Sequence, residues 1–187
     1  MVMASVTPVS LDTFVAAVLR IAQDDFATTP MMRLLTEARL PDEAVLRCLR
    51  FDEERYTRHL IHRTSDVEIL ALAWPKESAT PIHDHAGQRC WMVAHCGSFV
   101  VDDYRQVAGA RKPGYAVVEQ IATTAGVTVG MPDYRHRGDR DIHRVALTPG
   151  CDRAVSIHIY AKPYSSCLIF DEDSKQAREI PMNYDPL

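Results

Sequence analysis

The sequence predicts a mainly β protein, a β-sandwich or barrel preceded by a helical segment. Two patterns support this. In the first third of the chain, apolar residues recur every three or four positions, which is typical of amphipathic helices. After Ser65, many short apolar or alternating runs are separated by turn residues at regular intervals, which is typical of all-β folds. We expect a single domain over residues 1–187, with helical structure over about 9–62 and a barrel over about 65–171.

The helical segment is expected to contain three helices. The first spans about 11–23, with Ser10 as its N-cap. The second follows Pro30, and the third follows Pro41, where two acidic residues are favourable in the first turn. Residues 52–62 could continue as helix or break into a loop and a strand.

The first predicted strand, residues 67–74, is apolar at every position except Glu68 and is expected to be largely buried. A loop containing prolines then leads to a pair of histidines. Further strands are expected at 91–101, 115–121, 127–131, 142–147 and 154–161. Turns are expected at glycines and prolines, at Gly97, Gly109, 113–114, Gly126, Gly130, Pro132 and 149–150.

Composition is ordinary for a globular protein, with 47% hydrophobic and 25% charged residues. The net charge of −4 is small, so we expect no nucleic acid and no anionic membrane as partner. No apolar run reaches membrane-spanning length, and the start of the chain lacks the basic region of a signal peptide. The five cysteines have no disulfide spacing, which favours reduced thiols in a cytoplasmic protein. We expect a monomer, because no long exposed apolar helix requires a partner.

The first candidate site is the histidine pair His83 and His85. On a strand, residues two apart point to the same face, so one metal ion could contact both. Two ligands leave the coordination shell largely empty, and the donors downstream are His143 and His158. A lone histidine is more often a hydrogen-bonded or surface residue, but this combination favours a metal site.

Residues 154–160 form the second candidate. In a strand, Ser156, His158 and Tyr160 share one face, while the β-branched residues between them share the other. A polar face of this kind is either exposed to solvent or lines a site.

The histidine pair, Gly97, residues 126–130, Pro132 and His143 resemble the two motifs of the cupin superfamily, a small jelly-roll barrel that holds one metal. Cupins usually carry a glutamate a few residues after the second histidine. In this chain no acid stands there, and Cys90 occupies the place where the acid is expected.

Five blocks resemble thiol dioxygenases of the cysteine dioxygenase type more closely. They are Arg55-Tyr-Thr-Arg-His-Leu60, Ile-His-Asp-His with Cys90 five residues on, His-Arg-Val, Val-Ser-Ile-His-Ile-Tyr160 and Cys167-x-x-Phe-Asp171. The blocks lie between about 55 and 171, and each keeps the family's internal spacing. The resemblance implies a cupin jelly-roll β-barrel with a helical N-terminal segment.

The same resemblance implies that His83, His85 and His143 hold ferrous iron, Fe(2+), with positions left open for the substrate and O2. A thiolate substrate brings its own negative charge, which accounts for a ligand set without a carboxylate. Imidazole suits iron, although zinc and copper compete on affinity alone.

Arg58 resembles the family residue that grips the substrate carboxylate, which a guanidinium can do with two hydrogen bonds. Relatives that act on 3-mercaptopropionate commonly lack this arginine, so Arg58 favours cysteine. Without the resemblance, Arg58 would be interpreted as a basic residue on a helix surface. Tyr56 corresponds to a tyrosine near the substrate and Trp74 to a pocket wall, although either could equally belong to the core.

By resemblance, Tyr160 places its hydroxyl near bound oxygen, and His158 and Ser156 fix its orientation. Cys90 and Tyr160 match the pair that forms a thioether cross-link in animal-type members. The alternative for Cys90 is a buried apolar thiol. Cys167 resembles a residue at the pocket entrance, and a structural thiol is an equal interpretation.

Two residues depart from animal members. Arg89 stands where they have a histidine, and His59 replaces an asparagine beside Arg58; both could alter the pocket mouth or the substrate preference.

We expect a non-haem iron thiol dioxygenase that oxidises L-cysteine with O2 to cysteine sulfinate. The alternatives are a dioxygenase for 3-mercaptopropionate or another small thiol acid, and a metal-binding cupin of another class, such as an isomerase or a non-enzymatic binding module.

Overall fold

The computed structural model describes residues 7–136, 138 and 140–187. Its helices are Leu11–Gln23 (α1), Thr28–Glu37 (α2) and Asp42–Leu46 (α3). Its strands are Thr7–Pro8 (β1), Ala38–Arg39 (β2), Thr57–Arg63 (β3), Val67–Pro75 (β4), Ile82–His83 (β5), Arg89–Cys96 (β6), Phe99–Gly109 (β7), Gly114–Val127 (β8), Asp133–Arg135 (β9), Ile142–Leu147 (β10), Arg153–Ala161 (β11), Ser166–Asp171 (β12) and Gln176–Pro181 (β13). Within these described ranges, no helix combines the length and the apolar character needed to cross a lipid bilayer.

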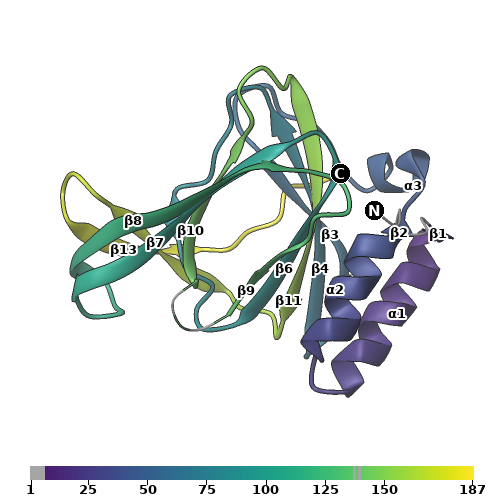
Figure 1. Cartoon of the computed structure of the whole chain (residues 1–187), viewed down its shortest axis with the longest axis horizontal. Helices are drawn as coiled ribbons and strands as arrows, with labels where there is room; N and C mark the ends of the chain where they lie inside the picture. The colour runs from purple at the N-terminus through teal and green to yellow at the C-terminus, as the bar shows by residue number, and fades with distance from the viewer. Residues whose placement is uncertain (1–6, 137, 139) are drawn as a thin grey trace.

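The described residues form three layers (Figure 1). The middle layer is a five-stranded sheet in the order β3-β4-β11-β6-β9. Helices α1 and α2 cover one of its faces. The other face packs against a curved sheet in the order β10-β5-β12-β13-β8-β7, which closes where β10 pairs with β7. The predicted mainly β, cupin-type jelly roll with N-terminal helices is therefore confirmed.

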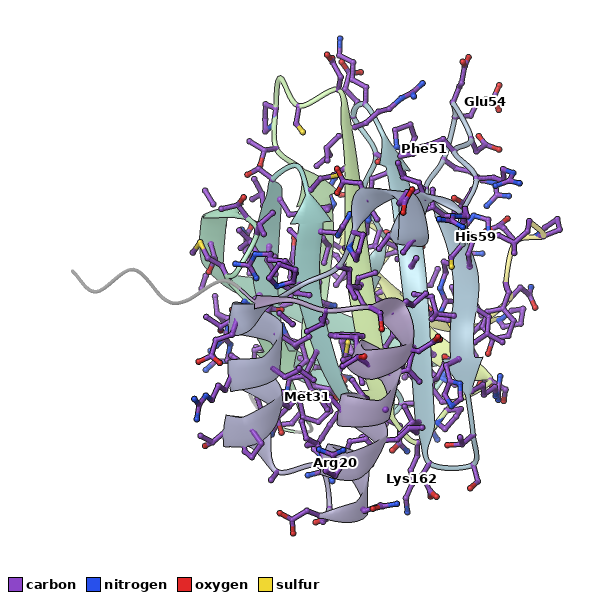
Figure 2. The ribbon with its side chains drawn as sticks, turned by 90° about the vertical axis from the view of Figure 1, so that its right-hand side faces the viewer. Arg20, Met31, Phe51, Glu54, His59 and Lys162 are labelled. Atoms are coloured by element: carbon purple, nitrogen blue, oxygen red, sulfur yellow. The ribbon has the colours of Figure 1, made fainter. Side chains whose placement is uncertain are left out.

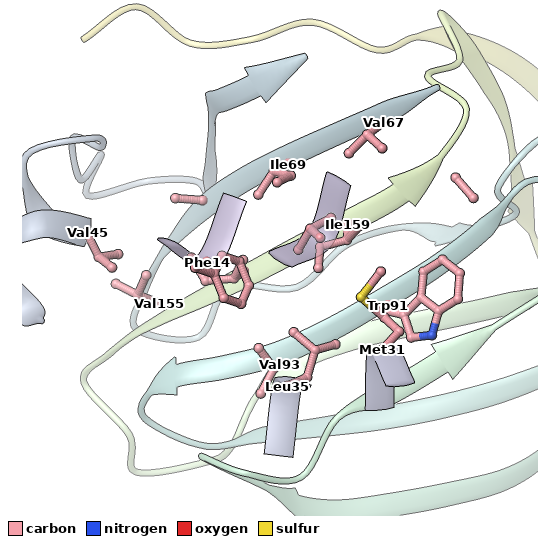
Figure 3. Close-up of a cluster of buried hydrophobic side chains, with 14 of the residues drawn as sticks. Phe14, Met31, Leu35, Val45, Val67, Ile69, Trp91, Val93, Val155 and Ile159 are labelled. Carbon is pink, nitrogen blue, oxygen red and sulfur yellow. The ribbon is translucent and has the colours of Figure 1, made fainter. Parts of the chain in front are cut away.

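The helical layer is held on the sheet by the apolar core drawn in Figure 3. Phe14 of α1 and Met31 and Leu35 of α2 are buried in this core against residues of β4, β6 and β11. The predicted N-cap of α1 is confirmed, because Ser10 Oγ accepts a hydrogen bond of 3.1 Å from the backbone N–H of Thr13. Figure 2 shows this layer from the helix side.

Strand β4 is buried along its whole length, as its apolar run predicts. The cause is the three-layer arrangement. Val67 and Ile69 point into the core under the helices, whereas Leu70 and Leu72 point into the core between the two sheets. A sheet covered on both faces favours apolar side chains on both faces of a strand, and in β4 the one charged exception, Glu68, is paired with Arg63.

Gly97 makes the turn between β6 and β7. Its φ of +80° lies in the left-handed region, and a Cβ at this position would lie 2.5 Å from the Cβ of Ala154. The turn divides the single strand predicted over 91–101 into two strands that belong to different sheets. The turn predicted at Gly97 is confirmed, but the run over 91–101 is not one strand, because the chain crosses between the sheets at this glycine.

The predicted end of the helical segment at 62 was also wrong. Helix α3 ends at Leu46, and the alternative of a loop followed by a strand holds for residues 52–62. Strand β3 forms there because its backbone groups pair with β4 at six positions, with a shift of register between Leu60 and His62. Helix α2 begins at Thr28, so that Pro30 lies in its first turn rather than before it.

The strand predicted at 115–121 is part of a longer strand, β8, which runs from Gly114 to Val127, and only the first residue of the strand predicted at 127–131 belongs to it. The residues after it form a turn, in which the N–H of Met131 bonds to the carbonyl of Thr128 at 3.0 Å. The barrel also continues beyond the predicted limit of 171, because β13 pairs with both β12 and β8. Alternation could not reveal β13, since most of its side chains are exposed.

Candidate metal centre and active site

Three of the predicted ligands, His83, His85 and His143, lie together between the sheets. One ring nitrogen of each lies within 4.8 Å of the others. Strand pairing produces this cluster, because His83 in β5 stands directly opposite His143 in β10, and His85 follows two residues after His83. His158, the other candidate donor, lies outside the cluster.

The surroundings of these rings suit a metal ion. Nδ1 of His83 lies 3.0 Å from the carbonyl oxygen of Pro81, and Nδ1 of His85 lies 3.2 Å from that of Asp141. An N–H at Nδ1 donating to a carbonyl leaves Nε2 as the coordinating atom. Nδ1 of His143 is buried without a hydrogen-bond partner among the described residues, and a nearby ion is one way to account for such an atom.

The protonation of the three rings is uneven. Burial lowers the pKa of His83 to about 3, with a further contribution from the charge of His85. Burial, followed by the charges of the other two imidazoles, holds the pKa of His143 well below its ordinary value. Burial would lower the pKa of His85 as well, but Cys90 and Asp141 outweigh it and raise the value to about 10. A cation that binds here must displace a proton from His85.

Arg58 reaches the same pocket from β3 and carries a charge without a counterpart. The whole residue is 9% exposed, and no carboxylate of the described residues lies within the 4.0 Å of an ion pair. Its guanidinium makes one hydrogen bond in the described structure, from Nη1 to the carbonyl of Asn183 at 3.3 Å. A buried, unpaired cation is costly, so this position suits an anionic ligand. The interpretation of Arg58 as a helix-surface residue is excluded.

The pocket combines residues from both sheets and from the C-terminal segment. Its lining consists of Tyr56, Arg58, Leu72, Thr80, Pro81, His83, His85, His143, Val145, His158, Tyr160, Cys167, Ile169, Ile180 and Met182. The arrangement therefore places a possible metal site, a free cationic side chain and a tyrosine hydroxyl around one small cavity.

Ser156, His158 and Tyr160 share one face of β11, as alternation predicts, and they form a hydrogen-bonded chain. Trp74 Nε1 donates to Ser156 Oγ at 2.8 Å. Ser156 Oγ lies 2.8 Å from His158 Nε2, and His158 Nδ1 lies 3.5 Å from the Tyr160 hydroxyl. The indole of Trp74 extends the chain by one member that the sequence did not reveal.

Trp74 also gives this chain a direction. An indole N–H can only donate, so it occupies an acceptor position of Ser156 and leaves the serine hydrogen for His158 Nε2. Burial, followed by the charge of Arg58, lowers the pKa of His158 to about 3, so its ring is neutral and carries one hydrogen, on Nδ1. That hydrogen points at the Tyr160 oxygen. Burial, followed by Cys90, raises the pKa of Tyr160, so its own hydrogen remains available to the pocket.

Cys90 and Tyr160 face each other across paired strands. They are directly opposite in the antiparallel register of β6 and β11, and both are buried. Side chains at such positions have Cβ atoms about 4.5–5.5 Å apart. Cys90 is therefore close to Tyr160, and it is a free thiol.

Two further predicted residues line the pocket. The ring of Tyr56 stacks on Trp74 with centroids 4.9 Å apart. Cys167 is buried, and its thiol lies 3.4 Å from the sulfur of Met182.

His59 and Arg89, the two departures from animal members, do not line the pocket. His59 lies on the helix side of the sheet (Figure 2), where its Nε2 accepts a hydrogen bond of 3.1 Å from the backbone N–H of Arg50. Arg89 forms an ion pair with Asp25 at 3.0 Å, and its guanidinium lies over the ring of Phe26.

Sequence reasoning missed several residues around the site. Ile180 and Met182 reach the pocket from the C-terminal end of the chain, and no local pattern indicated this. Asp141 contacts His85 and stands two residues before His143, a spacing that could have been noticed.

Fold and site together define a cupin-type barrel that gathers three histidines where one metal ion could bind. The sequence model of the family "Cysteine dioxygenase type I" matches residues 1–173. The chain belongs to this family.

Curated relatives carry the same family name at low identity. The chain is 23% identical over 185 residues to cysteine dioxygenase type 1 of Danio rerio, covering 95% of this chain and 87% of the relative. It is also 23% identical to the Homo sapiens protein of that name, covering 72% of this chain and 65% of the human protein, which is less than two thirds of its length. Among solved structures, an RmlC-like cupin protein from Desulfovibrio desulfuricans is 17% identical, with a TM-score of 0.44, covering 64% of this chain and 93% of the other.

Proposed function

We propose that this protein is an iron-dependent thiol dioxygenase that converts L-cysteine to cysteine sulfinate. The observation that carries the proposal is Arg58, a buried cation without an acidic partner among the described residues, in the pocket of the three-histidine cluster. Its free N–H donors match a carboxylate on the substrate. One thiol and one O2 give the sulfinic acid, so the reaction needs no external reductant.

The histidines His83, His85 and His143 would hold Fe(2+), which when bound supplies open coordination positions and the electrons that let O2 react with sulfur. Because all three ligands are neutral, the site remains favourable for an anionic thiolate. Arg58 fixes the carboxylate end of the substrate, and this orients the thiol toward the histidines.

Tyr160 is proposed to donate its hydrogen to an oxygen atom of the reacting group. The support is the direction of the hydrogen bonds from Trp74 through Ser156 to His158. In this direction the Tyr160 oxygen accepts from His158, so the tyrosine hydrogen is free to be donated. The raised pKa of Tyr160 keeps this hydrogen in place at neutral pH.

We further propose the thioether between Cys90 and Tyr160. The bond would join Cys90 Sγ to the ring carbon beside the Tyr160 hydroxyl, with one hydrogen lost from each side chain. This is a two-electron oxidation, and O2 is the oxidant. The opposed positions of the two residues in β6 and β11 support it.

The deciding experiment is oxygen uptake by iron-loaded protein, with cysteine and 3-mercaptopropionate in parallel and the products identified by mass spectrometry. We expect faster turnover of cysteine, giving its sulfinate. A preference for 3-mercaptopropionate would retain the iron site and overturn the assignment of Arg58. If iron is bound but neither thiol gives a sulfinate, the protein is a cupin of another class.

A matched variant tests the ligand set. His143→Ala should lose iron, because only two of the three histidine ligands would remain. Full iron occupancy in this variant, measured by metal analysis, would remove His143 from the ligands.

A further inference from the structure

Two buried carboxylates lie directly behind the three histidines. Asp84 stands between His83 and His85 and is 5% exposed, and Asp141 is 2% exposed. Asp84 Oδ1 accepts the backbone N–H of Leu168 at 2.9 Å, which ties the histidine loop to β12. Asp141 lies against His85, with Oδ1 3.5 Å from Nδ1.

One guanidinium joins both carboxylates. Arg111 stands in the turn between β7 and β8, and its Nη1 lies 3.0 Å from Asp141 Oδ2 and 3.4 Å from Asp84 Oδ2. The side chain of Arg111 is 42% exposed, and it lines an open basin outside the metal pocket. Arg111 therefore links the loop that carries His83 and His85 with the segment that leads into His143.

We propose that Asp141 and Arg111 are positioning residues of the metal centre. This inference rests on the proposed function, because it assumes that the three histidines hold the metal. Asp141 orients the ring of His85 and supports its donation to the metal, and Arg111 holds the Asp141 carboxylate in place. Carboxylates that accept the second N–H of a ligating imidazole commonly have this effect.

The ligand set gives this carboxylate a particular role. The position where cupins usually carry a coordinating acid holds Cys90, so no described acid belongs to the histidine cluster. Asp141 places a negative charge behind His85 without occupying a coordination position. The metal then gains electrostatic stabilisation, while the positions for substrate and O2 stay open.

A competing account involves the backbone alone. The carbonyl oxygen of Asp141 is nearer to His85 Nδ1, at 3.2 Å, than its carboxylate at 3.5 Å. Oδ1 has no hydrogen-bond partner among the described residues. The carbonyl could therefore orient the ring without help, and a test has to separate carbonyl from carboxylate.

The substitution Asp141→Asn makes this separation, because it preserves the backbone carbonyl and the side-chain shape but removes the charge. Metal-free full-length protein would be titrated with Co2+, followed by the absorption bands of the bound ion and by calorimetry. We expect the affinity of Asp141→Asn for Co2+ to fall about 10-fold or more, which is the usual effect of losing such a partner. Its Co2+ bands should shift, a change that a purely structural role would not produce.

Arg111→Gln should weaken Co2+ binding by a smaller factor, and Arg111→Lys should restore part of the loss, because it retains the charge. The matched control is Lys112→Gln, which removes the neighbouring charge in the same turn and should leave affinity and spectrum unchanged. Arg111 is partly exposed, so its variants are expected to fold, which melting curves of the metal-free proteins would check.

Equal Co2+ affinity and equal spectra for Asp141→Asn and the unaltered protein would overturn the inference and leave the carbonyl as the positioning group. Failure of the proposed metal site gives a different result. In that case the unaltered protein itself takes up no Co2+, or binds it equally well as His143→Ala.

Discussion

Arg58 has a charge, a buried position and no acidic partner among the described residues. We predict that Arg58→Ala raises the KM for cysteine roughly 100-fold. A hydrogen bond to a charged group is worth about 1.5–3 kcal/mol, and about 1.4 kcal/mol corresponds to a tenfold change. Steady-state oxygen uptake would measure the KM, and metal analysis should show an unchanged iron content.

Arg58→Lys is the matched control. It retains the charge but loses the planar fork, so it should recover only part of the affinity. Unaltered kinetics in Arg58→Ala would show that the carboxylate is bound elsewhere.

Cys90 and Tyr160 permit a second prediction at this scale. After incubation with iron, cysteine and O2, part of the protein should be lighter by two hydrogen atoms in an intact mass spectrum. Cys90→Ser should lack this species, because the sulfur that would form the bond is gone. A cross-linked fraction that persists in Cys90→Ser would contradict the pairing.

Among the elements, the C-terminal segment after β13 holds the strand that carries Arg58. Asp185 accepts the backbone N–H of Arg58 at 2.8 Å and pairs with Arg55, and the Tyr184 hydroxyl donates to Glu68. The segment also contributes Met182 to the pocket lining. The position of Arg58 therefore depends on residues more than a hundred positions away.

The pH dependence of this contact follows from Asp185. The hydrogen bond from Arg55, partly opposed by burial, holds its pKa below the ordinary value. A carboxyl whose pKa is lower in the folded state stabilises the protein above its unfolded value, about 3.9, and this contribution is lost as pH falls through the lower folded value. Asp185→Asn should therefore have a lower Tm than the unaltered protein at pH 7.

The two melting temperatures should begin to converge below about pH 4 and meet only below the lowered pKa of Asp185 in the folded protein, where both side chains are uncharged. Thermal unfolding at a series of pH values measures this. A Tm difference that stays constant down to the acid range would show that the Asp185 charge contributes nothing.

At the scale of the whole molecule, the helical layer and the metal pocket lie on opposite faces of the middle sheet. Met31 of α2 is fully buried in the core between the helices and the middle sheet (Figure 3). We predict that Met31→Ala lowers the free energy of unfolding by about 2–5 kcal/mol, the usual result of a core cavity. Metal content of the folded protein should not change, because the cavity is on the far face.

Urea unfolding and metal analysis would test this, with Met32→Ala as the control. Met32 is only partly buried, so its truncation should be much less destabilising. Equal losses of stability in the two variants would show that the burial of Met31 in this core does not contribute more to stability than the partial burial of Met32.

That residues 1–187 form one domain, a monomer in the cytoplasm, stays a prediction.

Alternation and turn residues predicted much of the fold correctly. Strand β10 begins and ends where predicted, the face of β11 that carries Ser156 was correct, and α1 spans the predicted range. The failures are β3, the division at Gly97 and β13. Each of these three features depends on pairing with a distant strand or on packing against another sheet. Local periodicity in the sequence carries no information about such long-range contacts.

The same distinction applies to the site. Strand periodicity was sufficient to select His83, His85 and the face of Tyr160, whereas His143 and Arg58 became candidates through the family motifs; both kinds of signal are local properties of the chain. The tertiary structure supplies the reason why His143 and not His158 joins the cluster, since the pairing of β10 with β5 places His143 opposite His83. It also decided that Arg58 is buried without an acidic partner among the described residues, because burial and pairing arise only when distant segments pack together.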